Sequence, residues 1–235
     1  MKRITNSFVV VSDYGWLPEN IEDSWVHKDC ENYLLLDKMH RFKESKNVRH
    51  QKNVGQNVYD MFDFIVNNYD NLPNQTLFCR ACLMFPKGRK PPLSNGNISE
   101  DYFYEIANSM GFTELHDFWE WSHTSNASRM GPEKSFEEIN NSWYFNHHPP
   151  KYYGSLNHFL QDIYKDPELP SFIRFAPGCN YIIPKENILR NPKKLYEHIR
   201  NILSYDVVIG EAHMLERALY TIFNNDYEVQ DKYKD

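Results

Sequence analysis

The chain has 235 residues, of which 41% are hydrophobic and 25% charged, and its formal net charge is −6 at pH 7. These values are typical of one globular domain with a sizeable core. Proteins that bind the nucleic-acid backbone usually carry an excess of Lys and Arg. This chain has no such excess, so we do not expect it to bind nucleic acid. Aromatic residues make up 15% of the chain, which suits an ordinary core and also a pocket for ring-shaped ligands.

No apolar run has the length of a membrane span or of a signal-peptide core. The run near the N-terminus covers residues 8–11 and is far too short for either. We therefore expect a protein without a transmembrane segment, located in the cytoplasm or peripherally at a membrane. The four cysteines suit a reducing compartment; they are Cys30, Cys79, Cys82 and Cys179.

The first half of the chain alternates between short apolar runs and a helical pattern. Strands are expected over 8–14, 33–37 and 77–84, and apolar residues at helical spacing predict a helix over 56–69. Such alternation is typical of a parallel sheet with crossover helices.

The second half is irregular at first and periodic later. Residues 86–97 form a loop rich in Pro, Gly and Lys, and 119–153 indicate a long functional loop or subdomain. The remaining predicted elements are helices near 100–110 and over 156–164, 192–203 and 210–224, and strands over 172–175 and 179–183.

Polar residues stand in or at the ends of the early strands. Ligands of open parallel sheets bind beyond the carboxyl ends of the strands. We therefore expect one rim of the sheet to carry Ser12, Asp13, Asp37 and Arg80. Asp37 can accept hydrogen bonds from a base or a ribose, and a turn cap is an equally good interpretation of it.

A turn rich in Gly and Asn opens the predicted helix 56–69. Backbone amides next to a glycine at a helix start can approach an anion or a ribose closely, which makes Asn53, Gly55 and Asn57 candidates for binding. A helix-start turn needs Gly and Asn in any case, so a purely structural role is the alternative. Asp60 lies opposite the apolar stripe and is expected to be solvated.

The start of the last predicted helix supplies the candidate catalytic acid. Glu211 projects along the same face as the apolar residues that follow it, and a carboxylate so placed can be a general base. The alternative is a first-turn acid favoured by the helix dipole. Glu216 is expected at the edge of the apolar stripe, and Arg217 is expected to point away from its centre.

Two patterns resemble metal sites without matching one. Cys79 and Cys82 are three residues apart, which would place them on opposite sides of a strand, and no second C-x-x-C exists. The histidines between 116 and 158 lack metal-binding spacing; they include His123, His147, His148 and His158. A metal-dependent hydrolase built on these histidines remains an alternative function.

Several segments, in their order along the chain, resemble a poorly characterised domain family found beside polysaccharide-building genes. That family is similar to GT-A-type glycosyltransferases and more distantly to core-2 N-acetylglucosaminyltransferases. The resemblance covers about residues 7–224 and is weakest over 86–150. The segments are V-V-V-S at 9–12, N-V-G-Q-N at 53–57, I-V-N-N-Y-D-N-L-P at 65–73, F-A-P-G-C-N-Y-I-I-P-K at 175–185, P-K-K-L-Y at 192–196 and E-A-H-M-L-E-R at 211–217.

The resemblance implies a GT-A-like single domain over 1–235 and transfer of a sugar from a nucleotide-sugar donor to a glycan or other hydroxyl acceptor. It divides the chain into a nucleotide-binding half (7–85), an irregular insertion (86–153), an acceptor and catalytic half (154–224) and a tail (225–235). Donor contacts would come from the rim residues and the helix-start turn named above. Diphosphate and acceptor contacts would come from Arg174, Gly178, Asn180, Tyr181, Lys185, His213, Glu216 and Arg217.

The resemblance also implies a mechanism. Glu211 would be the catalytic base of an inverting transfer, although Ile-Gly precedes it where the core-2 group has Pro-Asp. GT-A enzymes usually bind a divalent metal through Asp-x-Asp, and this chain has Cys79-Arg-Ala-Cys82 at that place. We therefore expect no divalent metal and no cofactor, with fixed cations neutralising the leaving diphosphate. The competing interpretation is a non-catalytic nucleotide- or carbohydrate-binding module of the same fold.

Overall fold

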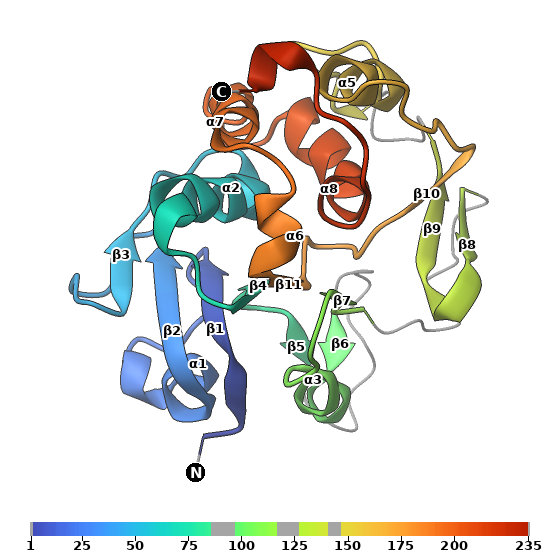
Figure 1. Ribbon diagram of the computed structural model, residues 1–235. Helices are drawn as coiled ribbons and strands as arrows, with labels where there is room; N and C mark the ends of the chain where they lie inside the picture. Colours follow the sequence, from blue (N-terminus) through green and yellow to red (C-terminus); the bar gives the residue numbers. More distant parts are fainter. Residues whose placement is uncertain (1, 86–96, 117–126, 141–146, 235) are drawn as a thin grey trace.

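A six-stranded sheet in the order β3-β2-β1-β4-β11-β7 forms the centre of the protein (Figure 1). The computed structural model describes residues 2–85, 97–116, 127–140 and 147–234. Four neighbouring strands are parallel, and β11 runs antiparallel to both of its neighbours. The strands are β1 (Ile4–Asp13), β2 (Cys30–Asp37), β3 (Val48–His50), β4 (Gln75–Arg80), β11 (Tyr181–Pro184) and β7 (Thr113–Glu114).

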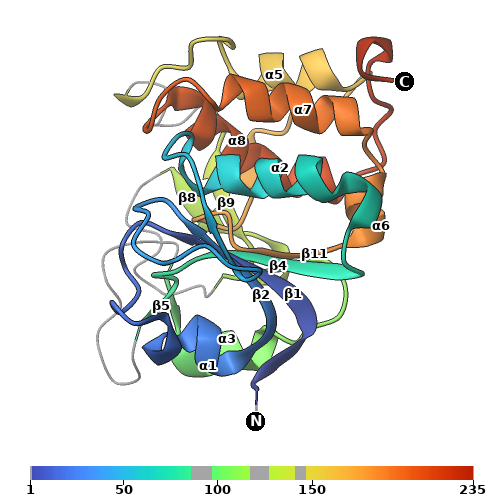
Figure 2. The same ribbon diagram turned by 90° about the vertical axis from the view of Figure 1, so that its left-hand side faces the viewer.

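Helices cover both faces of this sheet (Figure 2), so the predicted α/β class with a mostly parallel sheet is confirmed. One face carries α2 (Gln56–Asn68), α5 (Leu156–Ile163), α7 (Lys193–Ile202) and α8 (Gly210–Phe223). The other face carries α1 (Trp25–Asp29) and α3 (Glu100–Ile106). A short helix, α6 (Lys185–Leu189), follows β11. Among the described residues, no helix is both long enough and apolar enough to cross a membrane.

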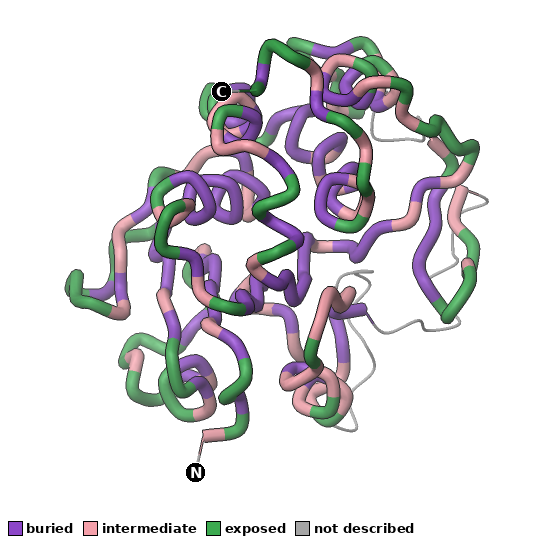
Figure 3. The backbone as a smooth tube through the Cα atoms, in the orientation of Figure 1, coloured by how far each residue is buried: buried purple, intermediate pink, exposed green. Residues whose placement is uncertain are grey.

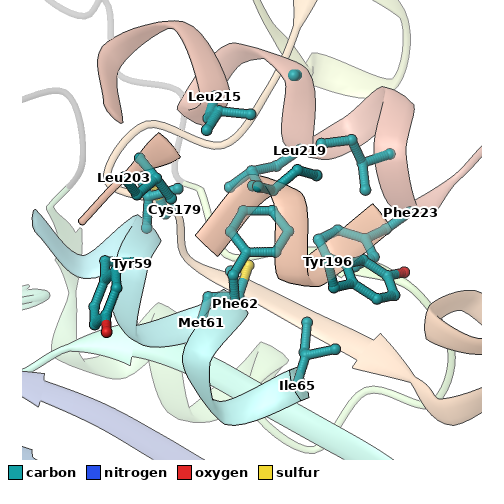
Figure 4. Packing of buried hydrophobic residues seen from close by; sticks show 14 of the residues in the cluster. Tyr59, Met61, Phe62, Ile65, Cys179, Tyr196, Leu203, Leu215, Leu219 and Phe223 are labelled. Atoms are coloured by element: carbon teal, nitrogen blue, oxygen red, sulfur yellow. The ribbon is translucent and has the colours of Figure 1, made fainter. Parts of the chain in front are cut away.

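The larger core lies between the sheet and the four-helix side (Figures 3 and 4). The helix α2 lies between the sheet and the helices α7 and α8, so side chains all around it are buried. Phe62 of α2 packs against Tyr196 of α7 and Phe223 of α8, with ring centroids 6.0 and 6.1 Å away. Aromatic residues thus form the joint between the three helices.

Two small sheets lie beside the central one. The first is antiparallel and contains β8 (Ser128–Met130), β9 (Phe136–Ile139) and β10 (Phe172–Arg174); the second pairs β5 (Met84–Phe85) with β6 (Ile98–Ser99). The 119–153 segment, expected to be a long loop or subdomain, contains the strands β8 and β9 in its described part. Short 3₁₀ turns complete the chain at Ile21–Asp23, Tyr69–Asn71, Pro132–Lys134 and Asp231–Tyr233.

The predicted strand over 77–84 ends earlier than expected. Its last residue is Arg80, because Ala81 N donates to Ser12 O and Leu83 N donates back to Arg80 O, which turns the chain. Cys79 is consequently in the strand, while Cys82 lies in the turn that follows. The C-x-x-C therefore spans a strand end.

Candidate functional site

The carboxyl ends of the parallel strands meet along one rim of the sheet. Asp13 at the end of β1 is paired in register with Asp37 at the end of β2, and Ser12 is paired with Arg80 at the end of β4. The chain places β2 and β3 on one side of β1 and β4 on the other. Ligands of open α/β sheets bind outside such a reversal of strand order.

The two aspartates of this rim hold loops in place. Asp13 accepts hydrogen bonds from Trp16 N at 2.8 Å and from an Arg41 guanidinium nitrogen at 2.7 Å. Asp37 accepts from Met39 N at 3.0 Å and from Phe42 N at 2.8 Å. Both residues are fully buried. The turn-cap interpretation of Asp37 therefore fits the structure, and a contact of either acid with a base or ribose does not.

A buried ion pair lies just below the rim and was missed in the sequence. Lys38 Nζ is 3.1 Å from Asp60 Oδ1, and the two side chains are 0% and 1% exposed. Asp60 was expected to be solvated; this was wrong, because α2 lies between the sheet and two other helices and has no solvent face at that position. Burial raises the pKa of Asp60 to about 6, while the Lys38 charge and the Ser12 side chain lower it. Ser12 is buried there as well.

The turn before α2 has a structural explanation. Gly55 has φ +55°, its N–H donates to Asp206 O at 2.8 Å, and an added Cβ would come within 2.5 Å of Leu203 O. Asn57 Nδ2 donates to Gly178 O at 2.6 Å, which ties this turn to the loop before β11. Asn53 Oδ1 is buried without a hydrogen-bond partner in the described part of the chain. The glycine is therefore required by close packing, and the two asparagines lie on either side of it.

The loop before β11 brings Arg80 to the rim. Arg80 N donates to Asn180 Oδ1 at 3.3 Å, and its guanidinium donates to Asn97 Oδ1 at 3.0 Å. An ideal Cβ on Gly178 would lie 3.1 Å from Arg80 Nε, so the glycine lets the guanidinium lie directly against the backbone. Asn180 is fully buried, and its amide donates to Pro177 O. Asn97 and Asn180 thus help to hold the positively charged Arg80 at the end of β4.

The first turns of α8 reach the same loop. Glu216 Oε1 accepts a hydrogen bond from Gly178 N at 2.5 Å, and Oε2 accepts from an Arg217 guanidinium nitrogen at 3.2 Å. The Glu216 side chain is 19% exposed. His213 Nε2 lies 3.5 Å from Gln56 Nε2 of α2, so α2 and α8 meet here. The structure thus gathers Arg80, Gly178, Asn180, Asn57, His213 and Glu216 around one end of the sheet.

Glu211 points inward, as expected, but its buried carboxylate already accepts three hydrogen bonds. Oε1 accepts hydrogen bonds from Lys151 N at 2.5 Å and Tyr152 N at 2.7 Å, and Oε2 accepts from Tyr205 Oη at 2.5 Å. The residue is 0% exposed. A general base must come within hydrogen-bond reach of the proton that it removes. This geometry argues against that role and assigns Glu211 to holding the 151–152 loop on the helix start.

Gly210 allows this loop to lie against α8. A Cβ at this position would meet His148 O at 2.3 Å and Pro150 N at 2.4 Å. Packing of the 148–152 loop therefore explains the glycine of the Ile-Gly pair that precedes Glu211.

Three other predicted site residues lie away from the rim or are enclosed. Lys185 follows Pro184, which pairs with Gln75 at the start of β4, so the antiparallel direction of β11 carries Lys185 to the opposite edge of the sheet. Arg174 is paired with Glu114 at 2.6 Å. Tyr181 is fully buried, and its hydroxyl accepts from Ala176 N.

Arg217 was expected to point away from the centre of the apolar stripe of α8, and the structure shows that it is nevertheless buried. It is 4% exposed, donates three hydrogen bonds to Glu138 at 3.0, 3.1 and 3.2 Å, and lies over the Phe175 ring. Arg217 is buried because the three-stranded sheet covers this side of α8.

Within the ranges that the structure describes, no group of three or more His, Cys, Asp or Glu side chains lies close enough to hold a metal ion. All four cysteines are unpaired thiols. His148 stacks on His213 with ring centroids 4.4 Å apart, while His123 lies outside the described residues.

Residues 10–234 match a protein family described as "Protein of unknown function (DUF3431)". The chain belongs to this family. Searches of curated proteins and of solved structures gave no match. The matched region contains all described helices and the whole central sheet except the first residues of β1. The rim described above therefore lies within it.

His213 predicts a pH dependence of stability. Burial lowers its pKa from 6.5 to about 4, with smaller contributions from His148 and Arg217. As the pH falls, His213 therefore binds a proton in the unfolded chain before it does so in the folded protein. The contribution of neutral His213 to stability is fully present above pH 6.5 and is lost as the pH falls toward 4. Between pH 7 and pH 5 we expect a loss of about 1–2 kcal/mol, allowing for partial solvent screening. Urea unfolding of wild type and His213→Gln should show this loss in the wild type alone; equal pH slopes would contradict it.

Proposed function

We propose that this protein transfers a sugar from a nucleotide-sugar donor to a hydroxyl acceptor, with the donor bound at the sheet rim between β1 and β4. The observation that carries the proposal is the reversal of strand order at this point, together with a cationic Arg80 at the end of β4. Diphosphates are recognised by guanidinium groups and by backbone N–H groups. The GT-A character of the sheet is part of the same proposal.

The proposed reaction uses two charged side chains. Arg80 stabilises the negative charge that develops on the leaving diphosphate, as a fixed cation does in phosphoryl and glycosyl chemistry. Glu216, whose side chain is 19% exposed, accepts the proton of the acceptor hydroxyl. The hydroxyl oxygen then forms a bond to the anomeric carbon on the side opposite the diphosphate, the carbon–oxygen bond to the diphosphate breaks, and the configuration inverts.

Glu216 thus takes the role that the resemblance gave to Glu211. We propose the reaction to be metal-independent, and the four unpaired thiols favour a reducing compartment such as the cytoplasm. The occupied carboxylate of Glu211 supports a second candidate function, a nucleotide- or carbohydrate-binding module without transfer. Release of nucleoside diphosphate from a nucleotide sugar distinguishes the two.

Replacing Arg80 tests the donor site. Thermal unfolding should shift upward with nucleoside diphosphates or nucleotide sugars, because a ligand that binds only the folded state stabilises it. Arg80→Ala should weaken nucleoside diphosphate binding at least about tenfold, because a charge-assisted contact contributes about 1.5–3 kcal/mol. The measurement is a titration with and without manganese.

Arg190→Ala is the matched control. Arg190 follows α6 and is paired with Asp226 at 3.4 Å on a solvent-exposed surface. We expect this variant to bind like the wild type. Absence of stabilisation by every diphosphate and nucleotide sugar, with or without manganese, would refute the donor site.

A further inference from the structure

A cavity of about 460 Å³ lies away from the rim, at the free edge of the central sheet. Its lining residues come from β7, from the end of α8 and from the segment around the three-stranded sheet; Figure 1 shows where these elements lie. This volume is within the usual range of small-molecule sites. Its walls are formed by Tyr102, Phe112, Thr113, Glu114, His116, Glu133, Lys134, Ser135, Arg174, Tyr220 and Asn224.

The charges in this pocket compensate one another. Arg174 Nε donates to Glu114 Oε2 at 2.7 Å, and Glu133 Oε2 lies 3.4 Å from the same guanidinium. Lys134 also lines the pocket, so its two cationic side chains equal its two carboxylates in number. An anionic ligand would meet two carboxylates and a cation already paired with them, and a cationic ligand would compete with Arg174. The electrostatics therefore favour a neutral ligand.

Aromatic and hydrogen-bonding groups alternate around the same cavity. Phe112 meets Tyr220 edge to face with centroids 5.7 Å apart, and Arg174 lies over the Tyr220 ring at 4.6 Å. Glu114 Oε1 and Ser135 Oγ are buried and have no hydrogen-bond partner among the described residues. Buried polar groups normally have partners, so the walls contain unused hydrogen-bonding capacity. Flat apolar rings next to such groups match the two surfaces of a pyranose, its C–H faces and its hydroxyl edge.

We propose that this pocket binds a neutral saccharide of one or two pyranose units. Glu114 is paired in register with Tyr181, and Leu115 N donates to Asn180 O at 2.9 Å, so the pocket is one strand away from Arg80 and the rim. A saccharide in this pocket is separated from Arg80 by one strand, and we assign it to the acceptor class of the reaction proposed above. The acceptor role rests on that proposed function, whereas binding of the saccharide does not.

Binding is tested without any nucleotide, so the result is independent of the donor site. Maltose, cellobiose, chitobiose and mannobiose are titrated into the 235-residue protein and followed by saturation-transfer NMR, with glucuronate and glucosamine as charged probes. We expect at least one neutral disaccharide to bind with a Kd in the millimolar range or below and to bind more tightly than both charged sugars. Tyr220→Ala should weaken it at least about tenfold through loss of the aromatic surface.

Two further variants keep the test decisive. Asn224→Ala removes an exposed side chain at the end of α8 and should weaken binding about threefold, even if Tyr220→Ala does not fold. Tyr152→Ala, a matched aromatic truncation outside the pocket, should bind within about twofold of the wild type. Three outcomes would overturn the proposal. These are no binding of any neutral disaccharide, binding as tight as wild type in both the Tyr220 and Asn224 variants, and tighter binding of a charged sugar. Saccharide binding without nucleotide binding would support the saccharide pocket and refute the proposed transferase function.

Discussion

Asp60→Asn should lower the free energy of unfolding by about 3–5 kcal/mol, the cost of leaving one member of a buried ion pair without its partner. Lys38 Nζ lies within 3.1 Å of Asp60 and also donates to Tyr14 Oη at 2.9 Å, Val54 O at 3.0 Å and Gln56 O at 2.7 Å. Burial lowers the pKa of Lys38, and the Asp60 charge offsets this. Without the carboxylate, the ammonium is buried among neutral oxygens. Urea unfolding at pH 7 measures the loss.

The double variant Lys38→Met/Asp60→Leu separates the pair from its surroundings. Apolar residues of similar volume often replace a buried ion pair at little cost, so the double variant should be more stable than Asp60→Asn. Asp23→Asn is the surface control, because its pair with Lys28 is well exposed and should contribute less than about 1 kcal/mol. A change below about 1 kcal/mol in Asp60→Asn would show that the pair is not charged in the folded protein.

Glu216→Gln should lower the rate of glycosyl transfer at least about 100-fold, because general-base catalysis typically contributes 10²–10⁴-fold. Glutamine can still accept the hydrogen bond from Gly178 N through its amide oxygen, so the loop before β11 should keep its position. Nucleoside diphosphate binding should therefore change by less than about threefold. Steady-state kinetics with a nucleotide sugar and a disaccharide acceptor give the first quantity, and titration gives the second.

Glu211→Gln is the matched variant on the same helix, and the opposite pattern is expected. Its carboxylate accepts from two backbone N–H groups and the Tyr205 hydroxyl, and an amide cannot accept all three. Stability should fall by about 1–3 kcal/mol, while transfer per folded molecule should stay within about threefold of the wild type. If Glu211→Gln abolished transfer and Glu216→Gln did not, the general-base role would return to Glu211.

The sequence by itself determined the α/β class, the parallel strands at the front of the chain and the shared rim at their ends. The reason is local: Val9, Val10 and Val11 form a continuous apolar run, which is typical of strands buried on both faces, and the period of 56–69 fits a helix. The turn at Gly55 was also visible, since a left-handed φ at a helix start favours glycine.

The tertiary structure alone decided which polar groups are buried and which edge of the sheet each reaches. Periodicity places Asp60 in solvent and Arg217 away from the centre of the apolar stripe of α8, but packing on more than one side of α2 and α8 buries both. The antiparallel direction of β11 moves Lys185 to the far edge, while it brings Asn180 to Arg80. Glu211 was correctly expected to point inward, yet its three hydrogen-bond donors come from loops that no local pattern places beside it. Burial and direction of strands depend on contacts between distant segments, and a single sequence read locally does not contain them.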